Sequence, residues 1–189
     1  MDADHPLHPV PVGAVGADFG ELRGMDPGEL SNLLLSKWEF FLHDAEERNQ
    51  PNILESYPYQ SHLRVLWQMN APEALLRDWL SRLYQLLAEH RPILVMLRFT
   101  GGAERARLVC ERRGQEWTDF VIDFVCKTAF GEAKGLVGLT GALTFFEAYS
   151  EELVRWSADW PFQKVELKAW GDEPKVHAAD IVRRLRLQE

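Results

Sequence analysis

The sequence has little cysteine and no long hydrophobic run. Its two cysteines, Cys110 and Cys126, are too few for a disulfide framework and lack the spacing of a zinc site. Both lie in apolar segments, which predicts free thiols packed in a core and a reducing cytoplasm as the setting. No apolar segment reaches the ~18 residues that a membrane-spanning helix needs, so no membrane segment is predicted.

Basic residues are scarce as well. The chain carries 21 Lys and Arg side chains against 29 Asp and Glu side chains, a formal net charge of -8. A nucleic-acid-binding protein uses a basic surface to neutralise phosphate, so nucleic acid is not predicted as a partner. An acidic surface suits a basic protein partner, although acidic side chains can also serve only to keep a protein soluble.

Phosphate-binding motifs are absent from the one glycine-rich segment. Four glycines precede an apolar, helix-like stretch: Gly131, Gly135, Gly138 and Gly141. A Walker A loop needs GxxxxGK[ST], but here Lys134 precedes a glycine and Leu136 follows it. No GxG occurs, which excludes the dinucleotide fingerprint. The segment is therefore predicted to be a turn that lets the chain enter a helix closely.

Two sets of residues support an alternative, a small-ligand site. Lys134, Thr140 and Gly141 stand at the start of a predicted helix, where free N–H groups favour an anion. Asp119 and Asp123 lie on one face of a predicted strand, but roughly 13 Å of strand separates them, too far for an acid/base pair on their own. A solvated sheet face with cross-strand ion pairs is the simpler expectation. The sequence therefore favours a protein without catalytic residues, metal or cofactor.

Apolar residues at helical spacing predict three main helices over 26–49, 71–90 and 141–160. The first has the clearest start, because Asp26 can cap it and Pro27 suits its first position.

Alternating apolar residues predict strands elsewhere. Three runs separated by turns within 93–128 indicate an antiparallel meander, and 61–69 and 164–170 add one strand each. The predicted fold is α+β, with an antiparallel sheet of about five strands packed by the three helices. Residues 1–25 are predicted to be an extended or disordered arm, and 26–189 a single domain.

Acidic residues on the predicted helices are candidates for partner binding. Carboxylates held on a rigid helix can steer and dock a basic protein, whereas a solvated helix face is the ordinary alternative. Large aromatic residues at predicted strand ends are candidate interface anchors. The candidates are Glu147, Glu151 and Asp159 on the last main helix, Glu46 and Glu47 on the first, and Trp117 and Trp170.

The predicted strand–helix–strand layout from Trp117 to Trp170 resembles that of small bacterial immunity proteins, which sequester a toxin domain through an acidic surface. The resemblance lies in layout without a shared motif, and no family is assigned. It implies an acidic, cytoplasmic protein-binding module, of immunity type, for a basic protein partner. Two alternatives stay open: a small-ligand-binding protein or enzyme that uses 131–141, and a structural subunit of a homo-oligomer.

Overall fold

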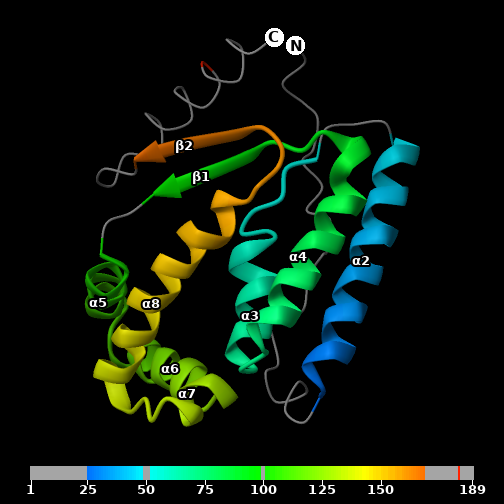
Figure 1. Ribbon diagram of the computed structural model, residues 1–189. Helices are drawn as coiled ribbons and strands as arrows, with labels where there is room; N and C mark the ends of the chain where they lie inside the picture. Colours follow the sequence, from blue (N-terminus) through cyan, green and yellow to red (C-terminus); the bar gives the residue numbers. More distant parts are fainter. Residues whose placement is uncertain (1–24, 49–51, 99–100, 169–182, 184–189) are drawn as a thin grey trace.

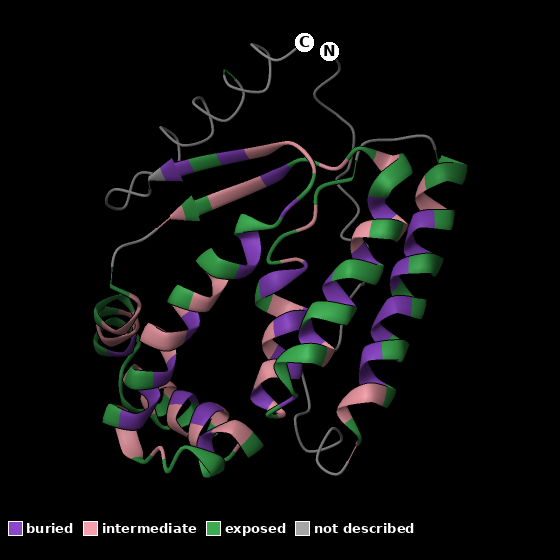
Figure 2. Cartoon of the chain, viewed as in Figure 1, coloured by how far each residue is buried: buried purple, intermediate pink, exposed green. Residues whose placement is uncertain are grey.

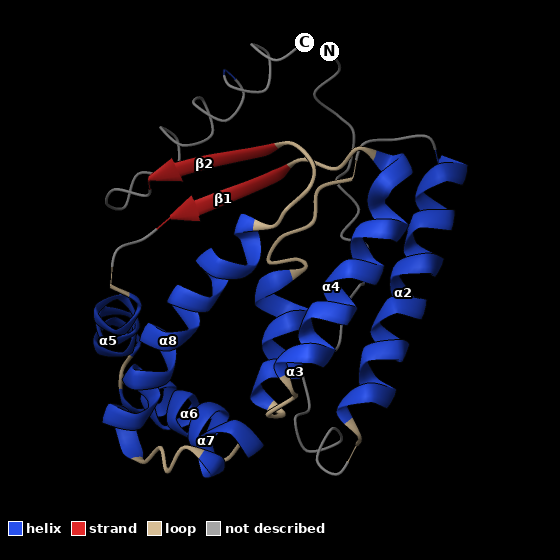
Figure 3. Ribbon diagram, viewed as in Figure 1, coloured by secondary structure: helices blue, strands red, loops and turns tan. Residues whose placement is uncertain are grey.

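The computed structural model describes residues 25–48, 52–98, 101–168 and 183, which are mostly helical (Figures 1 and 3). The elements are α2 (Pro27–Arg48), the π-helix η1 (Tyr59–Leu63), α3 (Arg64–Gln68), α4 (Glu73–Leu87), the 3₁₀-helix η2 (Ala88–His90), β1 (Leu94–Arg98), α5 (Gly102–Arg113), α6 (Gln115–Cys126), α7 (Ala129–Ala133), α8 (Gly138–Ala158) and β2 (Lys164–Lys168). Figure 1 shows α2 and α4 on one side, α5 to α8 on the other and α3 between them.

The prediction of an antiparallel sheet of about five strands is wrong. Only β1 and β2 are strands in the described part of the chain, and they pair in parallel, from Leu94 opposite Lys164 to Arg98 opposite Lys168. The other two runs of the predicted meander are helices α5 and α6, and 61–69 forms most of η1 and α3. The predicted strand at 164–170 is present as β2, but with a parallel partner.

Burial explains why the alternating pattern misled. In α6 the buried residues are Val121 and Val125, one helical turn apart, while Phe120 is 52% exposed. A strand would also place Asp123 on the face of Val121 and Val125, but Asp123 is exposed, as the helical period requires. In α5 the guanidinium of Arg107 pairs with both Glu104 and Glu111, three and four residues away, a spacing typical of a helix surface.

The three predicted main helices are present as α2, α4 and α8. The predicted start of α2 is confirmed in detail, because the Asp26 carboxylate accepts the N–H groups of Gly28 at 2.8 Å and of Glu29 at 3.1 Å. The predicted arm over 1–25 lies outside the described residues except for Met25, and the single-domain boundary at 26 stays a prediction.

A hydrogen bond between two buried rings joins α2 to η1. The indole N–H of Trp38 donates to Nδ1 of His62 at 3.0 Å, and His62 is only 1% exposed. Trp79 of α4 and Tyr57 meet the imidazole edge-on. Protonation of Nδ1 would break the bond from Trp38 and charge a ring that has lost its water. His62 is therefore held in its neutral form. Elsewhere along α2, the buried positions face α4 (Figure 2).

Burial, with a smaller effect from Lys37, lowers the pKa of His62 from 6.5 to about 4. In the unfolded chain His62 then binds a proton near pH 6.5, whereas in the folded protein it binds one only near pH 4. We expect neutral His62 to contribute fully to the free energy of unfolding above pH 6.5. That free energy should fall by on the order of 3 kcal/mol as the pH drops from 6.5 to about 4.

Urea unfolding at several pH values measures this effect, with His62→Asn as the control. Asparagine keeps an acceptor for Trp38 but does not titrate, so the variant should lose less stability between pH 6.5 and 4 whatever its stability at neutral pH. Equal losses in the two proteins would show that His62 does not carry the effect.

Candidate docking surface on helix α6

Three aromatic rings line one side of α6 and form what we call the aromatic stripe: Trp117, Phe120 and Phe124. The ring centroids of Trp117 and Phe120 are 5.3 Å apart, and those of Phe120 and Phe124 are 5.6 Å apart. Residues three and four places apart are neighbours on a helix, which is why the rings touch in series. Phe120 is the exposed member, and the other two are half-buried. The stripe is thus a continuous apolar surface open to solvent at its centre.

A guanidinium lies on the ring at each end of the stripe. Arg113 sits 4.1 Å above the Trp117 ring, and Arg64 sits 4.6 Å from the centre of the Phe124 ring. Arg64 also donates to the Gln68 side chain at 2.8 Å, and Gln68 donates to the Phe124 carbonyl at 3.0 Å. These contacts fix one end of the stripe to α3, while Arg113 at the other end is exposed.

The exposed end of the stripe forms an open hollow lined by Arg113, Glu116, Trp117 and Phe120. Arg113 ends α5 and Glu116 lies in the first turn of α6, and neither forms an ion pair with any residue that the structure describes. Instead of an ion pair, Arg113 makes a cation–π contact with the indole of Trp117. The hollow therefore offers two aromatic faces and a free carboxylate at its rim.

The flank of the stripe is acidic. Helix α6 carries three exposed carboxylates, Glu116, Asp119 and Asp123, and no Lys or Arg. Asp119 accepts a hydrogen bond from the Gln115 amide at 2.8 Å, and Asp123 pairs with Lys127 at 2.6 Å. Because α6 is a helix, Asp119 and Asp123 are one turn apart, at about 6 Å rather than the strand distance expected from the sequence.

The predicted acidic residues of α8 have different roles. Glu147 is half-buried and accepts the N–H of Ala103 at 2.8 Å, so it caps the N-terminus of α5. A methyl group on Gly102 would lie 2.4 Å from the Phe146 carbonyl oxygen, which shows how closely α5 meets α8 there. Glu151 is exposed, and exposed Asp159 ends the helix. The predicted acidic stripe is therefore interrupted at Glu147 by a structural contact.

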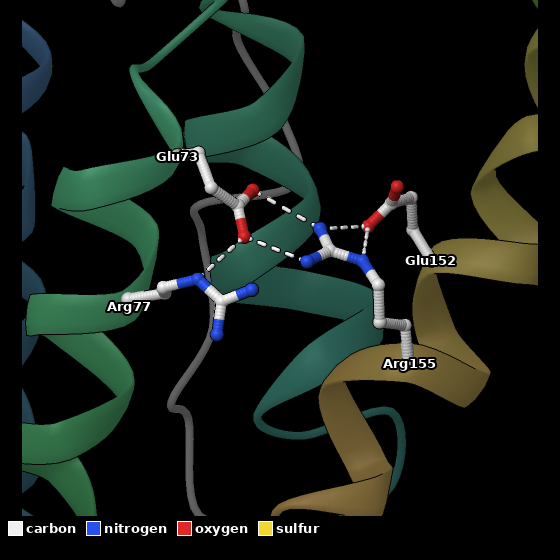
Figure 4. A network of polar contacts seen from close by, with 4 residues as sticks. All are labelled: Glu73, Arg77, Glu152 and Arg155. Carbon is white, nitrogen blue, oxygen red and sulfur yellow. Dashed lines mark hydrogen bonds and ion pairs between the residues drawn. The ribbon is translucent and has the colours of Figure 1, made fainter.

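An ion-pair network further divides that face of α8. Arg155 bonds to Glu73 of α4 at 2.7 and 3.0 Å and to Glu152, and Arg77 also pairs with Glu73 (Figure 4). The hydrogen bond from Arg155 lowers the pKa of Glu73. The stability that this contact adds is present at neutral pH and is lost as the pH falls through the lowered pKa. The network joins α4 to α8.

The remaining candidates lie apart from α6 in the chain. Glu46 stands 3.7 Å from His90, and Glu47 stands 3.5 Å from His43; both carboxylates are exposed on α2. Trp170 lies outside the described residues.

The residues named for the alternative ligand site occupy the α7–α8 connection. Lys134 follows α7 with its ammonium 5.9 Å from the Phe130 ring centroid, and Thr140 is exposed in the first turn of α8. Gly141 is buried, and a methyl group there would lie 2.8 Å from the Leu136 carbonyl carbon. The close chain approach predicted for Gly141 is thus confirmed. Within the described ranges, no group of three His, Cys, Asp or Glu side chains is placed to hold a metal ion.

Comparison of the chain with protein-family models, with curated proteins and with solved structures gives no match. Among the helices that the structure describes, none is long and apolar enough to cross a membrane.

Sequence reasoning identified Trp117 but missed Phe120, Phe124 and Arg113. For the two phenylalanines the signal was present in the spacing, since 117, 120 and 124 follow the three- and four-residue steps of one helix face; Arg113 ends the preceding helix, so spacing does not identify it. The signal was overlooked because the segment was interpreted as a strand.

The cap on α5 predicts different effects for two glutamates on the same helix. Glu147→Ala removes the acceptor for the Ala103 N–H and should lower the free energy of unfolding by about 1 to 2 kcal/mol. Glu151→Ala removes an exposed carboxylate and should change it by less than about 0.5 kcal/mol. Chemical denaturation of both variants measures the difference, and equal effects would contradict the capping role.

Proposed function

We propose that the protein is a non-catalytic protein-binding module that docks a partner on the aromatic stripe of α6. The observation that carries this proposal is the exposure of Phe120, 52% open to solvent at the centre of three touching rings. Buried Val121 and Val125 hold the helix in place, so the stripe is presented on a firm support. Exposed apolar patches with aromatic and Arg residues are typical of binding hot spots.

The partner that fits this surface is a basic, amphipathic protein segment. An apolar side chain would cover Phe120, and Lys or Arg side chains would meet the carboxylates of Glu116 and Asp119. Arg113 and Lys127 stand beside the two ends of α6, so the favourable charge lies along its middle. Complementary charge of this kind speeds encounter and sets the register of binding.

Sequestration of a toxin domain is one use of such a surface. The layout that suggested an immunity-type protein does not support it, because 117–126 is helical rather than a strand. The proposal rests instead on the composition and exposure of α6. We place the activity in a reducing compartment such as the cytoplasm, in keeping with Cys110 and Cys126, which are both free thiols.

Loss of the exposed ring should weaken partner binding without unfolding the protein. Affinity capture from the cells of origin with the wild type and with Phe120→Ser identifies proteins that depend on the stripe, and titration of the purified partner gives Kd. We expect the partner to be basic, to bind Phe120→Ser at least about tenfold more weakly, as for a hot-spot residue, and to associate more slowly at high salt.

Ile93→Ser is the matched control, because Ile93 is 45% exposed and precedes β1, on another part of the molecule (Figure 1). It should leave the same Kd unchanged. Equal retention of every captured protein by the wild type and Phe120→Ser would overturn the proposal, as would a partner with an acidic contact surface.

A further inference from the structure

The outer face of α2 carries a second exposed apolar pair. Leu33 is 46% exposed and Phe40 is 75% exposed. They are seven residues apart, which places them two turns apart on the same side of the helix. The opposite side carries the core residues Leu34, Trp38 and Phe41. Figures 1 and 2 show α2 at the edge of the molecule, with exposed positions facing outward along its length.

Carboxylates bracket this pair at both ends. Glu29 lies one turn before Leu33, and Asp44 and Glu47 lie one and two turns after Phe40 on the same side. Asp44 pairs with Arg48, and Glu47 is near His43, so these acids are partly engaged. Over its whole length α2 contains five Asp or Glu residues against Lys37 and Arg48. The two ends of this face are therefore acidic, and its centre holds Leu33, Phe40 and the single cation Lys37.

We propose that this face binds an amphipathic α-helix of a partner protein, with two apolar residues about seven positions apart bracketed by Lys or Arg. The seven-residue spacing of Leu33 and Phe40 matches the seam along which two helices pack. Ser36 and Lys37 both lie between them on that side of the helix; Ser36 leaves room for close approach, and Lys37 lies opposite the apolar centre of the partner rather than its basic ends. The carboxylates select the basic partner and disfavour a second copy of α2, whose equal charge would repel it.

The α2 face is separate from the aromatic stripe. Figure 1 shows α3 and α4 between α2 and α6, so two segments can bind at once. This inference goes beyond the proposed function, since it gives the protein two docking surfaces and the capacity to bridge two partners or to clamp one.

A synthetic peptide tests the α2 face directly on the full-length protein. The probe is an Ala-based helix of about 18 residues, about 27 Å long, with two Leu residues seven positions apart and Lys one turn beyond each. A second peptide has Glu in place of every Lys. Kd is measured by titration calorimetry at low and high salt, with the wild type, Phe40→Ser, Glu29→Lys/Glu47→Lys and Phe120→Ser.

We expect the Lys peptide to bind the wild type, more weakly at high salt, and the Glu peptide not to bind. Phe40→Ser and the charge-reversed variant should each raise the Kd at the α2 face at least about tenfold, while Phe120→Ser should keep the binding at the α2 face and lose only peptide that binds to the aromatic stripe. Because Phe40 is largely exposed, its variant should keep the wild-type circular dichroism and unfolding midpoint.

Three results would overturn the inference. The first is that the Lys peptide does not bind, and the second is that it binds Phe40→Ser as tightly as the wild type. The third is a wild-type dimer in light scattering that Phe40→Ser dissociates, because α2 would then be a self-association face. Binding that is lost only in Phe120→Ser would overturn the α2 face while supporting the proposed function of α6, so the two proposals fail independently.

Discussion

The packing of one ring, Trp67 of α3, holds the two sides of the helical protein together. Its centroid lies 4.3 Å from that of Phe130 on α7 and 5.0 Å from that of Phe145 on α8, and Tyr149 and Trp156 complete the cluster. Since α5 and α6 both pack on α8, the position of the aromatic stripe relative to α2 and α4 depends on this contact. Stacked and edge-on rings bury much apolar surface and prefer particular relative orientations. The cluster around Trp67 therefore both stabilises the contact between these helices and fixes how they are oriented.

Helices with a regular apolar period were predictable, and helices without one were not. In α4 the apolar stripe is clear, and its five residues Leu76, Trp79, Leu80, Leu83 and Leu87 are all buried. In α6 aromatic and β-branched residues alternate, which satisfies the rule for a strand. The structure instead buries Val121 and Val125 against α8 and leaves Phe120 outside, because tertiary packing decides which apolar residues face inward.

The roles of the charged residues depended on neighbours that sequence spacing does not reveal. Glu147 and Glu151 are one turn apart on α8, but only Glu147 meets the free N–H at the start of α5. Arg155 similarly finds its carboxylate on α4, 82 residues away in the chain. On α2 and α6, Asp44 and Asp123 find partners close in sequence, Arg48 and Lys127, whereas Glu116 has no ion pair within the described residues. Both helices combine acids with an exposed phenylalanine, and this combination is the basis on which we propose them as docking surfaces.

The account depends most directly on the conformation of residues 115–126, since only a helix brings Trp117 to the same side as Phe120 and Phe124, whereas a strand would place it on the opposite face. Backbone Cα and Cβ chemical shifts, assigned by NMR on the full chain, report that conformation residue by residue. We predict an unbroken run of helical shifts from Gln115 to Cys126, with slow amide exchange at Val121 and Val125. Strand shifts over this segment would contradict the account, because the aromatic stripe would then not exist.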